Sequence, residues 1–285
     1  MSVLPDPIPR LEAAAQALQT PCGDGHIQWH RWGPADAGPS GPVVLLHGGS
    51  GSWTHWVRNI DALVAGGRQV LVPDLPGFGD SARPPGGGDA DDVAPAVEQG
   101  LAELLGTQRC DLVGFSFGGL TAGLLAAAHP ERTARLVVVG APAMGVSDAG
   151  RIVLRGWRHL EDATAREAVH RHNLGVLMLH RAEAIDELAL ALHSANVVRD
   201  RMQRRRLART EALKDALQQV RCPVWAIYGR EDVLYTGRMD LLAEAFARGA
   251  QFQGLTLIDG AGHWVQYERA AAFDAALAQV LSPLV

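Results

Sequence analysis

The sequence predicts an α/β fold with a mostly parallel central sheet that helices cover on both faces. Short apolar runs that indicate buried strands alternate along the chain with longer segments of helical spacing. Several of these runs are continuously apolar rather than alternating, which is typical of parallel strands buried on both faces. A sharp glycine-rich turn from an apolar run into an Ala/Leu-rich segment, at residues 114–118, is a third indication of the same architecture.

The strands and helices follow from these patterns in chain order. The predicted strands are residues 26–32, 43–46, 69–72, 110–113, 136–139, 224–228 and 255–258. The predicted helices are residues 55–64, 91–105, 117–129, 239–247 and 267–281.

One interval breaks the alternation, because no strand is predicted from residue 144 to 220. The segment is rich in Ala, Leu, Arg and His, and its apolar residues have helical spacing at Leu174, Leu177, Met178, Leu188, Leu192 and Ala195. We expect a helical cap at 144–220, inserted between two parts of an α/β core at 1–143 and 221–285. Such a cap excludes water from a site and shapes its substrate pocket.

Composition restricts the possible partners. The chain has 285 residues and a net charge of −5, which argues against a nucleic-acid partner. No apolar stretch approaches the ~20 residues of a membrane helix, and the N-terminus lacks the pattern of a signal peptide. The cysteines Cys22, Cys110 and Cys222 have no metal-ligand spacing. We expect a cytoplasmic monomer or homodimer that acts on a small molecule, needs no cofactor and holds no metal.

Ser116 is the predicted nucleophile. It stands in Gly-Phe-Ser-Phe-Gly between an apolar strand and a helix, so the turn pushes its hydroxyl out beyond the edge of the sheet. Glycines flank such a turn because backbone meets backbone there and leaves no room for side chains.

A serine hydroxyl needs a base to take its proton, and His263 fits that role. His263 follows the strand at 255–258, and Asp232 follows the strand at 224–228, so both lie where ligands bind in open α/β sheets. Asp232 would accept the second imidazole N–H and fix the tautomer. Glu231 is the alternative acid, although the Gly-x-x-Asp spacing favours Asp232.

A tetrahedral intermediate also needs an oxyanion hole. The backbone N–H of Phe117, directly after the nucleophile, is one expected donor. The second donor is expected in the His-Gly-Gly-Ser loop after the strand at 43–46, where we assign Gly49 and keep Ser50 as the alternative.

Taken together, these motifs resemble the α/β-hydrolase superfamily over nearly the whole chain. The resemblance rests on the His-Gly-Gly loop, on Asp-Leu-Pro-Gly-Phe-Gly at 74–79, on the serine turn, on Gly-x-x-Asp232 and on Gly-His263. Residues 262–268 look like the C-terminal signature of the meta-cleavage-product hydrolases, which cut a C–C bond in products of aromatic-ring degradation; related carboxylesterases and enol-lactonases share the machinery. The resemblance implies an indole beside the catalytic histidine, and Trp264 matches it.

The chain departs from the C–C hydrolase pattern in two places. Phe115 stands where members usually carry Asn, and no arginine aligns with the cap arginine that grips the dienoate carboxylate. The nearby arginines are Arg199, Arg201, Arg204, Arg205 and Arg206. We assign Ser50, Phe115 and Trp264 to the substrate pocket.

The leading interpretation is serine-dependent hydrolysis, through an acyl-enzyme, of a small and largely apolar ester or related carbonyl compound. The first alternative is a C–C hydrolase of the meta-cleavage type. The second, from another class, is a ligand-binding receptor on a hydrolase fold with vestigial turnover.

Overall fold

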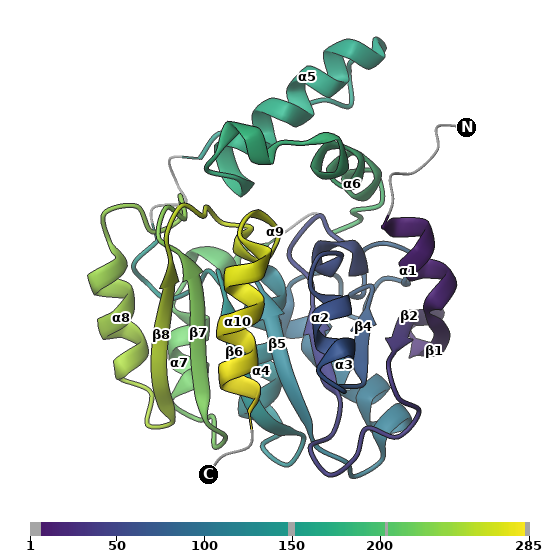
Figure 1. Cartoon of the computed structure of the whole chain (residues 1–285), viewed down its shortest axis with the longest axis vertical. Helices are drawn as coiled ribbons and strands as arrows, with labels where there is room; N and C mark the ends of the chain where they lie inside the picture. The colour runs from purple at the N-terminus through teal and green to yellow at the C-terminus, as the bar shows by residue number, and fades with distance from the viewer. Residues whose placement is uncertain (1–6, 148–151, 203–204, 283–285) are drawn as a thin grey trace.

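The computed structural model describes residues 7–147, 152–202 and 205–282. These residues form an eight-stranded sheet with the strand order β1-β2-β4-β3-β5-β6-β7-β8 (Figure 1). The strands are β1 (Gln16–Cys22), β2 (Gly25–Trp32), β3 (Val43–Leu46), β4 (Val70–Pro73), β5 (Cys110–Phe115), β6 (Thr133–Val139), β7 (Val224–Gly229) and β8 (Phe252–Ile258). Strands β3 to β8 pair in parallel, and β1 and β2 add an antiparallel pair at one edge. The predicted mostly parallel sheet is confirmed.

Helices cover both faces of this sheet. The α-helices of the core are α1 (Ile8–Ala14), α2 (Ile60–Ala65), α3 (Ala90–Leu105), α4 (Phe117–Ala128), α7 (Ala212–Leu217), α8 (Met239–Ala247), α9 (Val265–Glu268) and α10 (Ala270–Leu281). Helices α3, α4, α7 and α8 contribute to the hydrophobic cluster on one face, and α1, α2 and α10 contribute to the cluster on the other.

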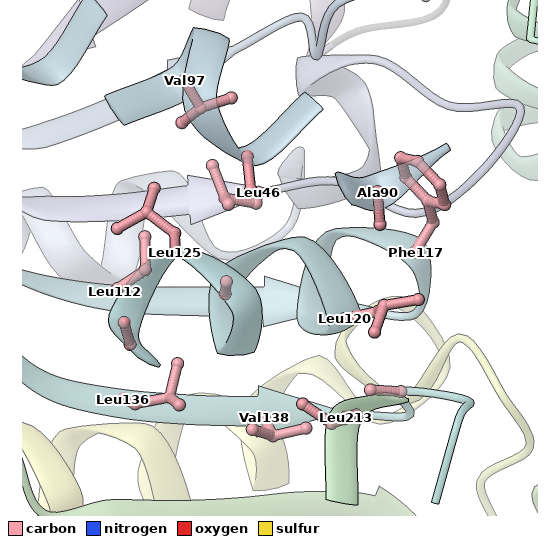
Figure 2. Packing of buried hydrophobic residues seen from close by; sticks show 14 of the residues in the cluster. Leu46, Ala90, Val97, Leu112, Phe117, Leu120, Leu125, Leu136, Val138 and Leu213 are labelled. Atoms are coloured by element: carbon pink, nitrogen blue, oxygen red, sulfur yellow. The ribbon is translucent and has the colours of Figure 1, made fainter. Parts of the chain in front are cut away.

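Successive side chains of a strand point to opposite faces of the sheet, so one strand contributes residues to both hydrophobic clusters. In β3, for example, Val44 and Leu46 pack into the first cluster while Val43 and Leu45 pack into the second. Figure 2 shows part of the first cluster, in which α4 lies against the sheet. All four residues of β3 are fully buried, which explains why this strand is apolar without interruption.

The structure adds one strand to the predicted elements and corrects two of the predicted helices. Strand β1 was not expected, because its sequence mixes polar residues with a proline; it pairs with β2 through the tight turn at Gly23 and Asp24. The helix predicted at 55–64 is a 3₁₀ turn, Trp53–Trp56, followed by α2. The helix predicted at 267–281 is divided into α9 and α10, because Arg269 between them leaves the helical conformation.

Helical elements also fill much of the predicted cap. They are α5 (Ala163–Asn173), a π-helix at Leu174–Met178, 3₁₀ turns at Ala182–Ala184 and Leu207–Arg209, and α6 (Glu187–Val197). Helices α5 and α6 lie beyond one end of the sheet (Figure 1). Asn196 of α6 accepts a hydrogen bond at 2.8 Å from Ser52, in the loop that follows β3.

Helix α7 lies within the predicted cap segment but packs on α4, where Leu213 contacts the helix at Gly123. The division into core and cap therefore stays a proposal, in which α5 and α6 cover the site.

Candidate active site

Ser116 lies at the turn between β5 and α4 in a strained conformation. Its φ of 52° and ψ of −117° are unusual for a residue with a side chain, and such strain costs about 1–3 kcal/mol unless the surroundings hold it. The backbone holds it here: the Ser116 N–H donates to the Val139 carbonyl at 2.8 Å, and the Ser116 carbonyl accepts the Gly119 N–H at 2.9 Å. A side chain on Gly114 would overlap the backbone of Gly118, so the turn requires the flanking glycine.

The structure brings the three predicted catalytic side chains together. Ser116 Oγ lies 2.9 Å from His263 Nε2, and His263 Nδ1 lies 2.9 Å from Asp232 Oδ2. Asp232 is fully buried, and its other oxygen accepts the Leu234 N–H at 3.0 Å. Since a carboxylate only accepts hydrogen bonds, Nδ1 carries the imidazole proton, and Nε2 is left to accept the serine hydroxyl proton. The arrangement can therefore generate an alkoxide nucleophile at Ser116.

Glu231, the alternative acid, does not reach the histidine ring. Its Oε2 instead accepts the backbone N–H of Ala261 at 3.0 Å, two residues before His263. The contact stabilises the loop that carries His263 but does not orient its imidazole.

The two expected oxyanion donors border the same cavity as Ser116 Oγ. Phe117 is the first residue of α4, where helix N–H groups have no intrahelical partner. Gly49 lies in the loop after β3, and within the described ranges its N–H donates to no protein group.

His47 holds this loop: its Nε2 accepts the Leu75 N–H at 2.8 Å and its Nδ1 donates to the Gly48 carbonyl at 2.8 Å. Burial lowers the pKa of His47 to about 4, so the ring stays neutral and keeps both hydrogen bonds.

Two neighbouring cavities lie at this site. The smaller, of about 180 Å³, is bordered by Ser116 and His263 and is otherwise mainly apolar. Its other lining residues are Gly49, Phe115, Phe117, Pro142, Leu177, Met178, Arg205, Ala208, Arg209 and Leu234. The larger, of about 530 Å³, extends beneath the cap helices, and both cavities are bordered by Gly49, Leu177, Met178 and Arg205.

The three predicted pocket residues occupy different positions. Ser50 borders the larger cavity and Phe115 the smaller. Trp264 borders neither of these two cavities; it is 1% exposed, stacks on Tyr267, and donates through Nε1 to the His55 carbonyl at 3.0 Å. Its indole therefore supports the wall of the site from behind, in place of the lining role that we expected.

Three further residues at the site could not be singled out from the sequence. His55 lines the larger cavity, and an ion pair between Arg205 and Asp200 closes over Ser50, whose Oγ donates to Asp200 at 2.5 Å. Arg205 belongs to the arginine run noted in the sequence, but the run alone does not show which of its arginines lies at the site. Two others pair elsewhere, Arg199 with Asp80 and Arg206 with Asp91. No local motif marks these contacts, because the partners are about 150 residues apart in the chain.

One group of potential metal ligands lies outside the site. Glu98, His129 and Glu131 place ligand atoms within 4.8 Å of one another. Glu98 already accepts Arg132 Nε at 3.2 Å, so a cation there would compete with an ion pair. The expectation that the protein holds no metal stays a prediction.

Comparison with known proteins places these features in a family. Residues 41–270 match the family model described as alpha/beta hydrolase fold. The 2-hydroxy-6-oxo-6-phenylhexa-2,4-dienoate hydrolase of Burkholderia cepacia is 30% identical over 261 residues, which cover 84% of this chain and 87% of the relative. The 2-hydroxymuconate semialdehyde hydrolase of Pseudomonas sp. (strain CF600) is 30% identical over 87% of this chain and 89% of its own length. The crystal structure of the carboxylesterase CesB from Bacillus subtilis superposes with a TM-score of 0.74 at 20% identity, covering 95% of this chain and 93% of that one.

Proposed function

This chain belongs to the α/β-hydrolase fold family, and on that premise we propose that it cleaves a small, largely apolar ester or related carbonyl compound through an acyl-enzyme. The chain is an enzyme of the hydrolase class. The observation that carries the proposal is the pair of 2.9 Å contacts that join Ser116 to His263 and His263 to Asp232.

In the proposed reaction Ser116 Oγ attacks the substrate carbonyl while His263 Nε2 takes its proton. The N–H groups of Gly49 and Phe117 stabilise the oxyanion, and losing one such donor typically lowers the rate about 10²–10³-fold. The proton then passes from His263 to the leaving group, which leaves an acyl group on Ser116. Water, deprotonated by the same imidazole, releases the acid, while Asp232 stabilises the imidazolium in both steps.

The smaller cavity supports a modest acyl or alcohol group as substrate. Apolar side chains, among them Phe117, Leu177 and Leu234, surround the nucleophile there. Its volume of about 180 Å³ leaves room for a short chain or one aromatic ring, and the larger cavity beneath the cap would take the rest of the substrate.

A direct assay compares the wild type with Ser116→Ala on p-nitrophenyl acetate and butyrate. We expect the variant to lose at least about 10³-fold in kcat and to keep the thermal unfolding midpoint of the wild type. Asp232→Asn should lose a comparable factor, because an amide can stabilise the wrong imidazole tautomer. Ester turnover that persists in Ser116→Ala would contradict the proposal. Binding of the esters without turnover would favour the ligand-receptor alternative.

C–C bond hydrolysis is the second candidate, because two relatives at 30% identity are named as hydrolases of dienoate and semialdehyde compounds. The test is the ratio of kcat/KM for 2-hydroxy-6-oxo-6-phenylhexa-2,4-dienoate to that for p-nitrophenyl butyrate. A ratio above one would favour this candidate. Phe115→Asn adds a second test, since a large rise in dienoate cleavage would support a close relationship to the C–C hydrolases.

The wider expectations also stay proposals. A small-molecule substrate and no nucleic-acid partner agree with the net charge of −5, while monomer or homodimer and a cytoplasmic location are predictions to be tested. Among the described residues, no helix combines the length and the apolar character that crossing a membrane requires.

A further inference from the structure

Exposed apolar side chains are concentrated on the predicted cap. Among the residues that the structure describes, four large apolar side chains are well exposed, and three of them belong to the cap segment. They are Val153, Leu154 and Val198, which are 76%, 46% and 57% exposed. The fourth, Leu241, lies on α8 beside the sheet of the core (Figure 1). Single exposed apolar residues are normal, but several that gather in one place mark an interaction surface.

Two of these side chains belong to an irregular segment, residues 152–159, which we call the rim. Its residues 154–159 all line the larger cavity. Because Leu154, Arg155 and His159 line this cavity and are also exposed, the cavity opens to solvent along the rim.

The third exposed side chain adjoins the rim. Trp157 of the rim borders both the larger cavity and a surface groove lined by α5 and α6, and Val198 borders the same groove. The rim also contacts the end of α6, since Arg158 Nη2 donates to the Val197 carbonyl at 3.5 Å. The exposed apolar side chains of the cap therefore form one patch beside the opening of the cavity.

The rim carries positive charge. Its sequence, Ile-Val-Leu-Arg-Gly-Trp-Arg-His, contains two arginines and no acidic residue, in a chain whose net charge is −5. Within the described ranges neither Arg155 nor Arg158 forms an ion pair. The Cζ atom of Arg158 lies 5.1 Å from the centroid of the Trp157 ring, so a cation and an aromatic ring share one place on the patch. Acidic residues begin only with Glu161 and Asp162, and Asp162 caps α5 by accepting the Ala165 N–H at 2.6 Å.

The acidic side chains of the neighbouring groove do not neutralise the rim. Glu167 and Glu187 both pair with Arg171 instead, at 3.3 and 4.0 Å. Arg166 of the same groove forms no ion pair in the part of the chain that the structure describes. The unpaired cations therefore lie together with the exposed apolar side chains.

This combination fits a lipid surface better than a second copy of the chain. In a two-fold contact the patch would meet itself, so the arginines of one rim would face those of the other, and like charges in contact are costly. At an anionic lipid surface, by contrast, apolar side chains enter the layer between headgroups and acyl chains, where tryptophan is also favoured. Guanidinium groups then contact the headgroup phosphates.

We propose that the rim and Val198 form a docking surface for a lipid surface of negative charge. The contact is peripheral, because only side chains of the patch enter the headgroup layer. In the docked protein the larger cavity opens toward the lipid, so apolar esters dissolved there reach Ser116 without crossing water. This last consequence, unlike the docking itself, rests on the proposed function.

Sedimentation with vesicles measures the docking on the wild-type protein. The vesicles are made of ether-linked phosphatidylcholine, alone or with a quarter of ether-linked phosphatidylglycerol, so they contain no ester that the enzyme could cleave. We expect about tenfold or more stronger binding to the anionic vesicles, because two arginines of the rim contribute. The preference should fall at high salt, which screens exposed charges.

Substitutions on the patch test which residues bind. Val153→Glu should weaken binding to anionic vesicles about tenfold, because a carboxylate replaces an apolar side chain next to negative charge. Arg155→Gln should weaken it about fivefold, the contribution of one arginine near such a surface. Leu241→Glu on α8 and Arg248→Gln at its C-cap are the matched controls and should bind like the wild type.

Hydrogen exchange on the wild type covers the case in which the variants do not fold. Anionic vesicles should slow the exchange of amides at residues 152–160 and leave those at 239–249 unchanged. Unchanged exchange at 152–160 would contradict the proposal.

Three results of the binding experiments would overturn the inference. They are no binding to either kind of vesicle, equal binding to both, and control variants that bind as weakly as the patch variants. A dimer in sedimentation velocity that Val153→Glu dissociates, without vesicle binding, would assign the patch to a second copy of the chain.

Turnover separates the docking from the proposed function. The wild type should hydrolyse p-nitrophenyl decanoate faster in anionic than in neutral vesicles. Val153→Glu should lose this advantage and keep its kcat/KM for soluble p-nitrophenyl acetate, because Val153 borders neither cavity of the site. Equal turnover in the two vesicles by a protein that binds only the anionic ones would contradict delivery from the lipid. Absence of acetate turnover would contradict the hydrolase function, and vesicle binding would still judge the docking.

Discussion

Glu268 accepts the backbone N–H of Gly262 at 2.7 Å, one residue before the histidine that contacts Ser116. The same fully buried carboxylate accepts the N–H groups of His180 at 3.0 Å and of Arg181 at 2.7 Å, both from the segment that follows the π-helix of the cap. One side chain therefore joins the loop of His263 to the cap. The backbone N–H of Trp264, which donates to the Met178 carbonyl at 2.7 Å, is a second connection between the same two segments.

Glu268→Gln should destabilise the protein and slow catalysis. The amide replaces one acceptor oxygen with an NH₂ group that faces a backbone donor, so we expect a loss of about 2–4 kcal/mol in the free energy of unfolding. Because the loop of His263 loosens, kcat should fall more than KM rises. Urea unfolding and steady-state kinetics measure the two effects, and Glu231→Gln, whose amide oxygen can still accept the single contact from the Ala261 N–H, is the control. Unchanged stability and kcat in Glu268→Gln would show that the carboxylate does not hold this loop.

Gly49→Ala should lower kcat/KM for ester substrates about 10- to 100-fold. A methyl group at this position would overlap Nη1 of Arg205, which is held by its ion pair with Asp200, so the oxyanion loop must shift. Adding Arg205→Ala should restore part of the lost rate. Gly254→Ala, where nothing lies within 4 Å of the added carbon, is the control. If the double variant is as slow as the single one, the overlap with Arg205 is not the cause.

Asp274→Asn should raise stability at neutral pH. Burial raises the pKa of Asp274 to about 6 from 3.8, although its hydrogen bond from Asn59 at 2.8 Å opposes the shift. The folded state therefore binds this proton more tightly than the unfolded chain, and stability falls as pH rises through the interval from about 4 to 6. Asparagine carries no charge and can donate to the unpartnered Oδ1 of Asn59, so we expect a gain of about 1–2 kcal/mol at pH 7, reduced by solvent screening.

The measurement for Asp274→Asn is urea unfolding at pH 4 and pH 7. The gain should be present at pH 7 and much smaller at pH 4, where the wild-type carboxyl is protonated in the folded protein and about half protonated in the unfolded chain. An equal effect at the two pH values would mean that ionisation of Asp274 is not its source.

Buried neutral histidines should make the protein sensitive to acid. Burial lowers the pKa of His193 to about 4, as it does for His47. Below pH 6.5 these histidines bind protons in the unfolded chain but stay neutral in the folded protein. The free energy of unfolding that they contribute is therefore lost progressively as pH falls from about 6.5 to 4. In His193→Gln the difference in unfolding free energy between pH 7.5 and pH 5 should shrink by about 1–2 kcal/mol. A difference as large as that of the wild type would contradict the assignment.

The sequence predicted those parts of the molecule that depend on local patterns. The apolar run of β5, the glycine-flanked Ser116 and the Ala/Leu segment of α4 are contiguous, and their arrangement follows from strand, turn and helix chemistry. Asp232 and His263 were predictable because each directly follows an apolar strand, and the carboxyl ends of parallel strands meet at one edge of a sheet. Strand β1 was missed, because its burial comes from pairing with β2 and not from its own composition.

The pocket could not be predicted in the same way. Trp264 was expected to line it, but the indole is buried against His55, and the two residues are 209 positions apart. Arg205 and Asp200 reach Ser50 only because the chain returns over the site after α6. Contacts of this kind come from tertiary packing and leave no periodicity or motif in the sequence.

The most direct test of the proposed mechanism is mass spectrometry of the protein after reaction with a fluorophosphonate probe. The strained turn and the 2.9 Å contact with His263 Nε2 predict a single adduct, on Ser116, and no labelling of Ser116→Ala. Labelling should also fall steeply in His263→Ala, because the hydroxyl loses its base. An unlabelled wild type that still hydrolyses esters, or an adduct on another residue with full loss of activity, would contradict Ser116 as the nucleophile.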